Sequence, residues 1–159
     1  MVSALVPWFA GISGMNAEGV PVPALREIPR VKVTLADLRA QYPVGKGGGF
    51  VLGVPQVLHM ALDPEVAALI RGQRVELLGE WVGDGAGRWR VVRSQLGCCS
   101  AHAKESGVLV EAQGNLPYRQ KWVRVMGELG FERNESGWTP VVRGATVEET
   151  EAPAAAVLK

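Results

Sequence analysis

Hydrophobic and polar residues alternate with a period of two over most of the chain after Gly72. This alternation predicts β-strands, because successive side chains of a strand point to opposite faces. Strands are expected at residues 74–82, 88–95, 107–112, 121–132 and 138–147. Residues 84–87 (DGAG) and 134–137 (NESG) predict tight turns between the first two strands and between the last two.

Two glycines, Gly79 and Gly127, stand inside these predicted strands. Interior glycines are typical of the strongly bent strands of small barrels. Five short strands that open with a hairpin predict a mainly β fold, a small OB-like five-stranded barrel with a short helical N-terminal portion. A β-sandwich is the main alternative.

The residues before the strands carry helix signals. Asp63 as N-cap and Pro64 in the first turn predict a helix that ends at Gly72. Thr34 predicts the start of a second, short helix through Ala40. Both helices belong to the portion of the chain that precedes the barrel strands.

The proline-rich residues 19–29 predict an extended linker, since proline disfavours helix and central strand alike. Residues 31–34 (VKVT) alternate as a short strand would. The tail becomes acidic and then rich in proline and alanine, which is typical of a fraying terminus. We therefore expect three parts: an N-terminal extension and linker at 1–30, the OB-like domain at 31–150 and a flexible tail at 151–159.

Composition narrows the classes of partner. The 159 residues include 17 Lys and Arg against 16 Asp and Glu, a formal charge of +1 without any basic run. Nucleic-acid binding is disfavoured on this ground, because duplex binding leaves a strongly positive face. No segment has the roughly 20 apolar residues that span a bilayer. The apolar but short residues 1–15 are interpreted as the foot of a membrane helix or as the start of a truncated chain.

The adjacent thiols Cys98 and Cys99, followed by His102, are the most distinctive chemical feature. Two sulfur ligands and an imidazole suit a soft ion such as zinc, copper or a metalloid. A closed zinc site needs a fourth ligand. Three further residues are candidates for it: His59, Glu105 and Glu111. The alternative is that the cysteines are buried small side chains, and redox chemistry is a third reading.

Four tryptophans lie on predicted strands: Trp81, Trp89, Trp122 and Trp138. Aromatic residues on alternating strands mostly belong to the core or to a protein interface, although in OB barrels they also stack on bases. Arg88 and Arg90 flank Trp89 and form the candidate nucleic-acid patch. No Ser-His-Asp order, paired catalytic carboxylates or nucleotide fingerprint is present, so a non-enzymatic role is expected.

Several of these segments together resemble the C-terminal domain of the YcgQ-like family of permease subunits. The resemblance covers approximately residues 31–153. The matching segments are residues 72–79 (GQRVELLG), 98–103 (CCSAHA), 122–127 (WVRVMG) and 140–153. The double cysteine followed by the tryptophan strand is the most specific part. His102 stands where the family pattern has an aspartate, which puts a carboxylate role at this position in doubt and adds a soft-metal ligand.

The resemblance implies a membrane-associated accessory protein that is paired with a polytopic permease, with this domain outside the bilayer. The N-terminal membrane helices of the family are absent from this sequence, which implies a trimmed chain or a soluble variant. The leading hypothesis is a non-enzymatic accessory domain of a transport system with Cys98, Cys99 and His102 as metal contacts. A structural or protein-interaction module without metal, and a single-stranded nucleic-acid binder, are the alternatives.

Overall fold

The computed structural model describes residues 12–15, 21–23, 32–83, 88–95, 104–114, 116 and 120–154. The chain divides into two compact units, Met1–Lys32 and Val33–Lys159. In the first unit, β1 (Ile12–Met15) pairs antiparallel with β2 (Pro21–Pro23). The sequence predicted only an extended linker at 19–29, and the pairing of its first prolines with an upstream strand was missed.

The second unit contains three helices followed by most of the strands. Its helices are α1 (Leu35–Gln41), α2 (Val54–Ala61) and α3 (Pro64–Ile70). Its strands are β3 (Phe50–Leu52), β4 (Arg74–Gly83), β5 (Trp89–Gln95), β6 (Lys104–Ala112), β7 (Trp122–Asn134) and β8 (Gly137–Glu149). All five strands predicted after Gly72 are confirmed, and four of them are longer than predicted.

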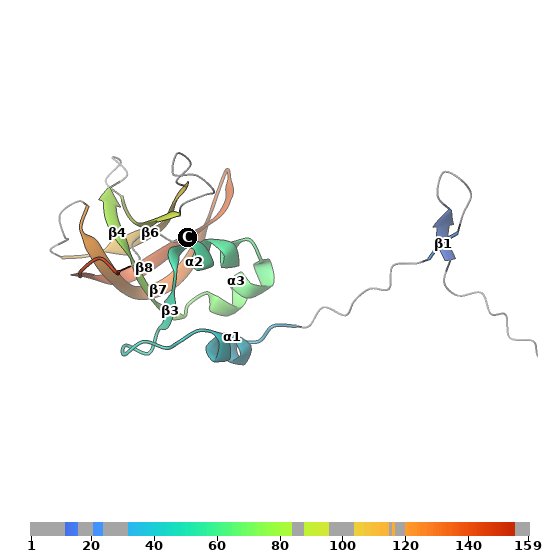
Figure 1. The fold of residues 1–159 in the computed structure, drawn as a ribbon, viewed down its shortest axis with the longest axis horizontal. Coiled ribbons are helices and arrows are strands. Elements are labelled where there is room, and N and C mark those ends of the chain that lie inside the picture. The colour runs from blue at the N-terminus through green and yellow to red at the C-terminus, as the bar shows by residue number, and fades with distance from the viewer. Residues whose placement is uncertain are drawn as a thin grey trace, which may run out of the picture. The chain divides into compact units, whose positions relative to one another are not determined.

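The five long strands form a closed barrel (Figure 1). Their order is β4-β5-β6-β8-β7, and β7 pairs with β4 again. All neighbours are antiparallel except β6 and β8, which run parallel. A five-stranded Greek-key barrel of this kind is the OB architecture. The predicted fold class, a mainly β barrel with a short helical N-terminal portion, is confirmed.

Strand β4 makes closure possible because it bends and serves three partners. Its first part pairs with β7 and, in parallel, with β3, while its last residues pair with β5. β5 approaches β4 most tightly at Gly79, where a Cβ atom would overlap the carbonyl oxygen of Val92 and approach the Val91 side chain to 2.8 Å. Only glycine allows β5 to come this close to β4.

The barrel core is filled by the inward residues of each strand. On β4 these are Val75, Leu77 and Trp81, all at most 1% exposed. Helix α2 adds Val54 and Val57, which are fully buried in the same cluster. Figure 1 shows α2 and α3 together on one side of the barrel. Helix α2 therefore covers the barrel and contributes to its core.

Helices α1 and α3 begin at the predicted caps. The Thr34 hydroxyl accepts from the Asp37 backbone N–H at 3.3 Å, and the Asp37 carboxylate accepts from the Thr34 hydroxyl and backbone N–H. These hydrogen bonds from Thr34 hold the pKa of Asp37 below its ordinary value. The Asp63 carboxylate accepts from the backbone N–H groups of Glu65 and Val66. Both caps are confirmed.

One feature of the N-terminal part was predicted wrongly. The described residues 32–34 form no strand, because Thr34 serves as the cap of α1 instead. Helix α2 was not predicted from the sequence. Pro55 lies in the first turn, where its missing N–H needs no partner, and Gln56 Oε1 accepts from Gly53 N at 2.7 Å. In the described part of the chain, no helix is long and apolar enough to span a membrane.

We predict that Gly79→Ala destabilises the barrel, because the added methyl group meets the β5 backbone at Val92. Overpacking of this kind lowers the free energy of unfolding by about 1–3 kcal/mol, measurable by urea denaturation. Gly47→Ala is the matched control, since a Cβ atom at this exposed loop position meets nothing within 4 Å. Equal stability of the two variants would contradict the role of Gly79.

Candidate functional site

The strand tryptophans divide into inward and outward residues. Trp81 is fully buried, and Trp89 stacks on it with ring centroids 5.0 Å apart and an angle of 8° between planes. Arg90 lies on the opposite face of β5, where its guanidinium comes within 2.8 Å of the Cβ position of Gly107. The three residues of the candidate patch therefore divide: Arg88 and the partly buried Trp89 line one hollow, and Arg90 lies on the other face of the strand.

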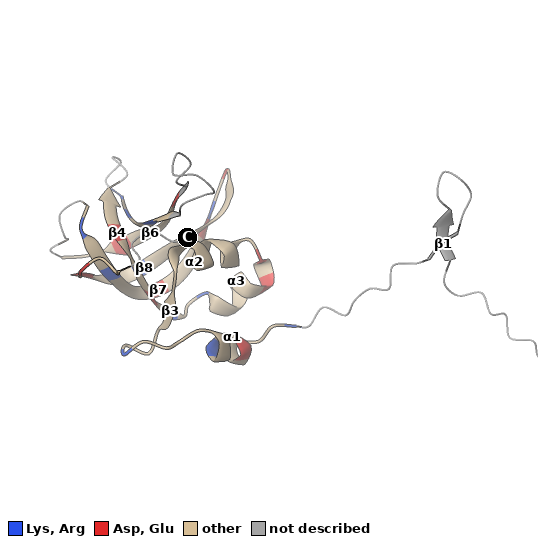
Figure 2. Ribbon diagram, in the orientation of Figure 1, with Lys and Arg blue, Asp and Glu red and all other residues tan. Residues whose placement is uncertain are grey.

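The outer face of the barrel carries paired charges. Arg124 and Glu76 form an ion pair between β7 and β4 at 3.1 Å. Arg143 on β8 contacts Glu132 at 2.8 Å and Glu111 at 3.5 Å. Figure 2 shows Lys and Arg interspersed with Asp and Glu along the described elements. Such a surface does not concentrate positive potential in the way that a nucleic-acid face does.

A groove of about 450 Å³ lies between α2, the start of β6 and the start of β8, and we call it the α2–β8 groove. It is lined by Pro55, Leu58, His59, Ala61, Leu62, Arg90, Glu105, Ser106, Gly107, Trp138 and Pro140. Leu62 is 79% exposed and Trp138 is 49% exposed. The guanidinium carbon of Arg71, at the end of α3, lies 5.5 Å from the Trp138 ring centroid. The groove thus combines exposed apolar surface with a cation held against an aromatic ring.

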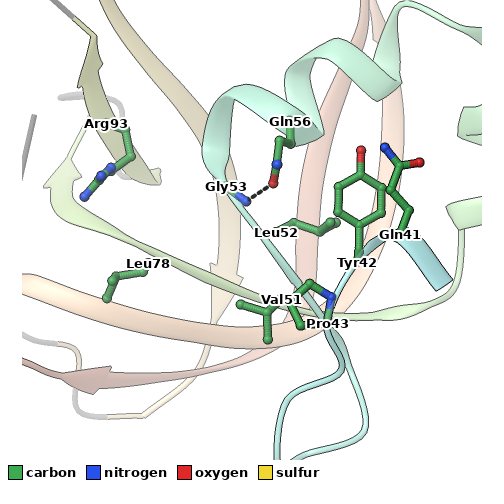
Figure 3. A pocket seen from close by; sticks show the side chains of 9 residues that line it. All are labelled: Gln41, Tyr42, Pro43, Val51, Leu52, Gly53, Gln56, Leu78 and Arg93. Carbon is green, nitrogen blue, oxygen red and sulfur yellow. Dashed lines mark hydrogen bonds between the residues drawn. The ribbon is translucent and has the colours of Figure 1, made fainter. Parts of the chain in front are cut away.

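A second cavity, of about 540 Å³, has Gln56 in its wall (Figure 3) and shares no lining residue with the groove. Arg93 on β5 is the charged residue of its wall and is only 8% exposed. The sequence contained a signal for this residue that was missed. Arg93 follows Trp89 and Val91 in steps of two, so the alternation assigns this arginine to the same face of the strand as the core residues.

The predicted metal ligands Cys98, Cys99 and His102 lie outside the described residues. Among the residues that are described, no group of three or more His, Cys, Asp and Glu side chains could hold a metal ion. Two of the three candidates for a further ligand, His59 and Glu105, line the same groove. The third, Glu111, contacts Arg143 instead.

Comparisons of this chain with protein-family models, with curated proteins and with solved structures found no match. The resemblance to YcgQ-like permease subunits therefore stays a prediction from the residues that carry it.

The two groups of tryptophans predict different costs of substitution. We expect Trp89→Ala to lower the free energy of unfolding by about 2–4 kcal/mol, because it removes a partly buried ring stacked on Trp81. Trp138→Ala should cost about 1 kcal/mol or less, since half of its surface is exposed and Arg71 is its ring contact. Urea denaturation of both variants tests the assignment, and the reverse order of stability would refute it.

Proposed function

We propose that this chain is a non-enzymatic accessory domain of a membrane transport system, and that it works by binding a partner protein in the α2–β8 groove. The observation that supports this proposal is the exposure of Leu62 and Trp138 in one groove. Burying a leucine side chain contributes about 1.5–3 kcal/mol, so a residue as exposed as Leu62 offers a large gain on association. Tryptophan and arginine are the residue types that most often dominate binding energy at interfaces.

The groove also indicates the chemistry of the partner. Its floor is apolar, with Leu58, Leu62 and Pro140, while Arg90 faces it from β5 and Arg71 lies over Trp138. Arg90 and Glu105 both line the groove, and Arg71 adds a further positive charge beside it, over the Trp138 ring. We propose an apolar segment flanked by an acidic residue as the occupant. Electrostatic complementarity of this kind favours association and fixes the register of the segment.

A polytopic permease is the proposed source of that segment. This step rests on the resemblance at residues 72–79, 98–103, 122–127 and 140–153. Single-stranded nucleic acid is a less favoured partner. Trp89, the aromatic residue of the candidate nucleic-acid patch, has one ring face stacked on Trp81, and Arg90 lies on the other face of the strand.

We predict that a photo-crosslinking amino acid at Leu62 captures a polytopic membrane protein in the native cell. The same amino acid at Val44 is the control, because Val44 is 55% exposed but does not line the groove. Trp138→Glu in the Leu62-labelled chain should abolish the crosslink, since it places a charge in the apolar contact. Mass spectrometry identifies the captured protein. A crosslink of equal yield at Val44, or one that survives Trp138→Glu, would contradict the proposed groove.

A second candidate function is contact with a soft metal or metalloid through Cys98, Cys99 and His102. The register of β5 and β6 favours it. Gln95 and Lys104, the described residues on either side of 96–103, pair with each other. Glu105 follows Lys104 and lines the same groove as His59, so two further candidate ligands share one groove.

We predict that the reduced protein binds about one soft ion per chain, as is typical of a single thiolate site. The double substitution Cys98→Ser/Cys99→Ser should abolish binding, and His59→Asn should weaken it. Glu111→Gln is the control, because Glu111 contacts Arg143 rather than lining the groove. Elemental analysis of protein purified without chelator gives the stoichiometry. Undiminished binding by the double variant would reject the site.

A further inference from the structure

The hydrogen bonds around Trp81 establish which way the backbone groups of β4 point. Trp81 N donates to the carbonyl of Lys121 at 2.8 Å, and the Trp81 carbonyl accepts from Gln120 N at 2.9 Å. The backbone groups of Trp81 therefore face the β7 side. Because these directions alternate along a strand, the backbone groups of Glu80 face β5, where Glu80 pairs with Val92.

The same alternation continues through β5 into β6. Since the backbone groups of Val92 face β4, those of Arg93 face β6, where Arg93 pairs with Ser106. The backbone groups of Ser106 are thus used by β5. Those of its two neighbours, Glu105 and Gly107, point to the opposite edge of β6, away from β5.

The opposite edge of β6 pairs with β8 only from Leu109 onward, where Leu109 lies beside Val141. To continue the parallel pairing one step earlier, residue 140 of β8 would have to donate a hydrogen bond to the carbonyl of Gly107. Residue 140 is Pro140, which has no N–H, so the pairing stops here. Among the strands that the structure describes, none pairs with the edge of β6 at Glu105 and Gly107.

This edge of β6 lies in the α2–β8 groove. Glu105 and Gly107 both line the groove, and Gly107 has no side chain, so its backbone forms part of the wall. The facing wall is apolar, with Leu58, Leu62 and Trp138. Backbone donors and acceptors on one side and apolar side chains on the other are the two components by which proteins bind an added strand.

We propose that the partner segment in the α2–β8 groove is an extended chain that adds to the barrel sheet as a strand, with its backbone hydrogen-bonded to Glu105 and Gly107. The proposal rests on the docking function above and names the form in which the partner binds. Alternate side chains of the segment pack on Leu58 and Leu62, and its acidic residue lies near Arg90, which also lines the groove.

An extended partner fits the groove better than a helical one. A helix bonds its own N–H and C=O groups internally, so it would cover the edge of β6 without using it. Backbone groups that a partner buries without hydrogen bonds cost about 1–3 kcal/mol each. An added strand satisfies the groups of Glu105 and Gly107 and contacts the apolar wall at the same time.

The first experiment removes one backbone donor from this edge. Glu105→Pro deletes the N–H that faces the groove and keeps the pairing of Ser106 with β5. Glu105→Gln is the reference, because it removes the same carboxylate and keeps the N–H. Both are made in the full chain that carries the photo-crosslinking amino acid at Leu62. We expect Glu105→Pro to give a yield of crosslinked membrane protein on the order of tenfold lower than Glu105→Gln.

The outcomes separate the bound form from the docking function. Equal yields from Glu105→Pro and Glu105→Gln would overturn strand addition and leave the groove as the docking site. A chain that gives no crosslink at Leu62 before either substitution would contradict the docking function itself. A crosslink between two copies of this chain would replace the proposed partner with a second copy.

The second experiment uses a defined peptide and keeps the test decisive if Glu105→Pro does not fold. The peptide has eight residues, one aspartate followed by alternating valine and threonine. Its control carries N-methyl groups on the two central residues, which face opposite edges, so neither edge can pair there. Binding to the full chain is followed by NMR and by amide hydrogen exchange.

We expect the unmodified peptide to shift the amide signals of Glu105 and Gly107 and to slow their exchange. The signal of Gly47, in the exposed loop before β3, should stay unchanged. The N-methylated peptide should bind at least about tenfold more weakly. Equal affinity of the two peptides, or no effect at Glu105 and Gly107, would refute the added strand.

Discussion

The close approach of β5 to β4 at Gly79 is the constraint on which the barrel depends. Here the carbonyl oxygen of Val92 occupies the space of a side chain. Along one edge, β4 pairs first with β3 and then with β5. Its other edge stays paired with β7. The five long strands close into a barrel through this change of partner, and β3 remains as an additional edge strand. Leu78, which lies between the two pairings, forms part of the wall of the cavity of about 540 Å³.

Helix α2 contributes residues to two hollows. Its inner residues, Val54 and Val57, belong to the barrel core and cannot move without disturbing it. Its first turn places Gln56 in the wall of the cavity of about 540 Å³ and Pro55 in the α2–β8 groove, which continues along the helix to Leu62. Both hollows therefore take residues from a helix rather than from loops alone, which favours precise geometry in each. Because they share one short helix, displacement of α2 would affect both.

The sequence was sufficient for the barrel and insufficient for the sites. Period-two alternation located the five long strands, and the capping residues Thr34 and Asp63 located two helices, since these signals are local. Helix α2 was not predicted, and its Pro55 lies in the first turn, where proline is tolerated. The groove forms where Leu62, after α2, and Trp138 on β8 line the same hollow. This is a tertiary arrangement that no local sequence signal indicates. The strand face of Arg93 could be predicted from the alternation, but the cavity that it lines could not.

The placement of aromatic residues argues that binding has moved away from the usual OB surface. That surface is the outer face of the second and third barrel strands, here β5 and β6. On β5, Trp89 packs on Trp81 and Val92 is buried. The Arg90 guanidinium lies close to Gly107 on β6. The exposed tryptophan among the described strands stands instead on β8, beside α2. Because tryptophan is enriched among the residues that dominate binding energy at interfaces, the helical segment that precedes the barrel contributes to the surface that we propose for binding.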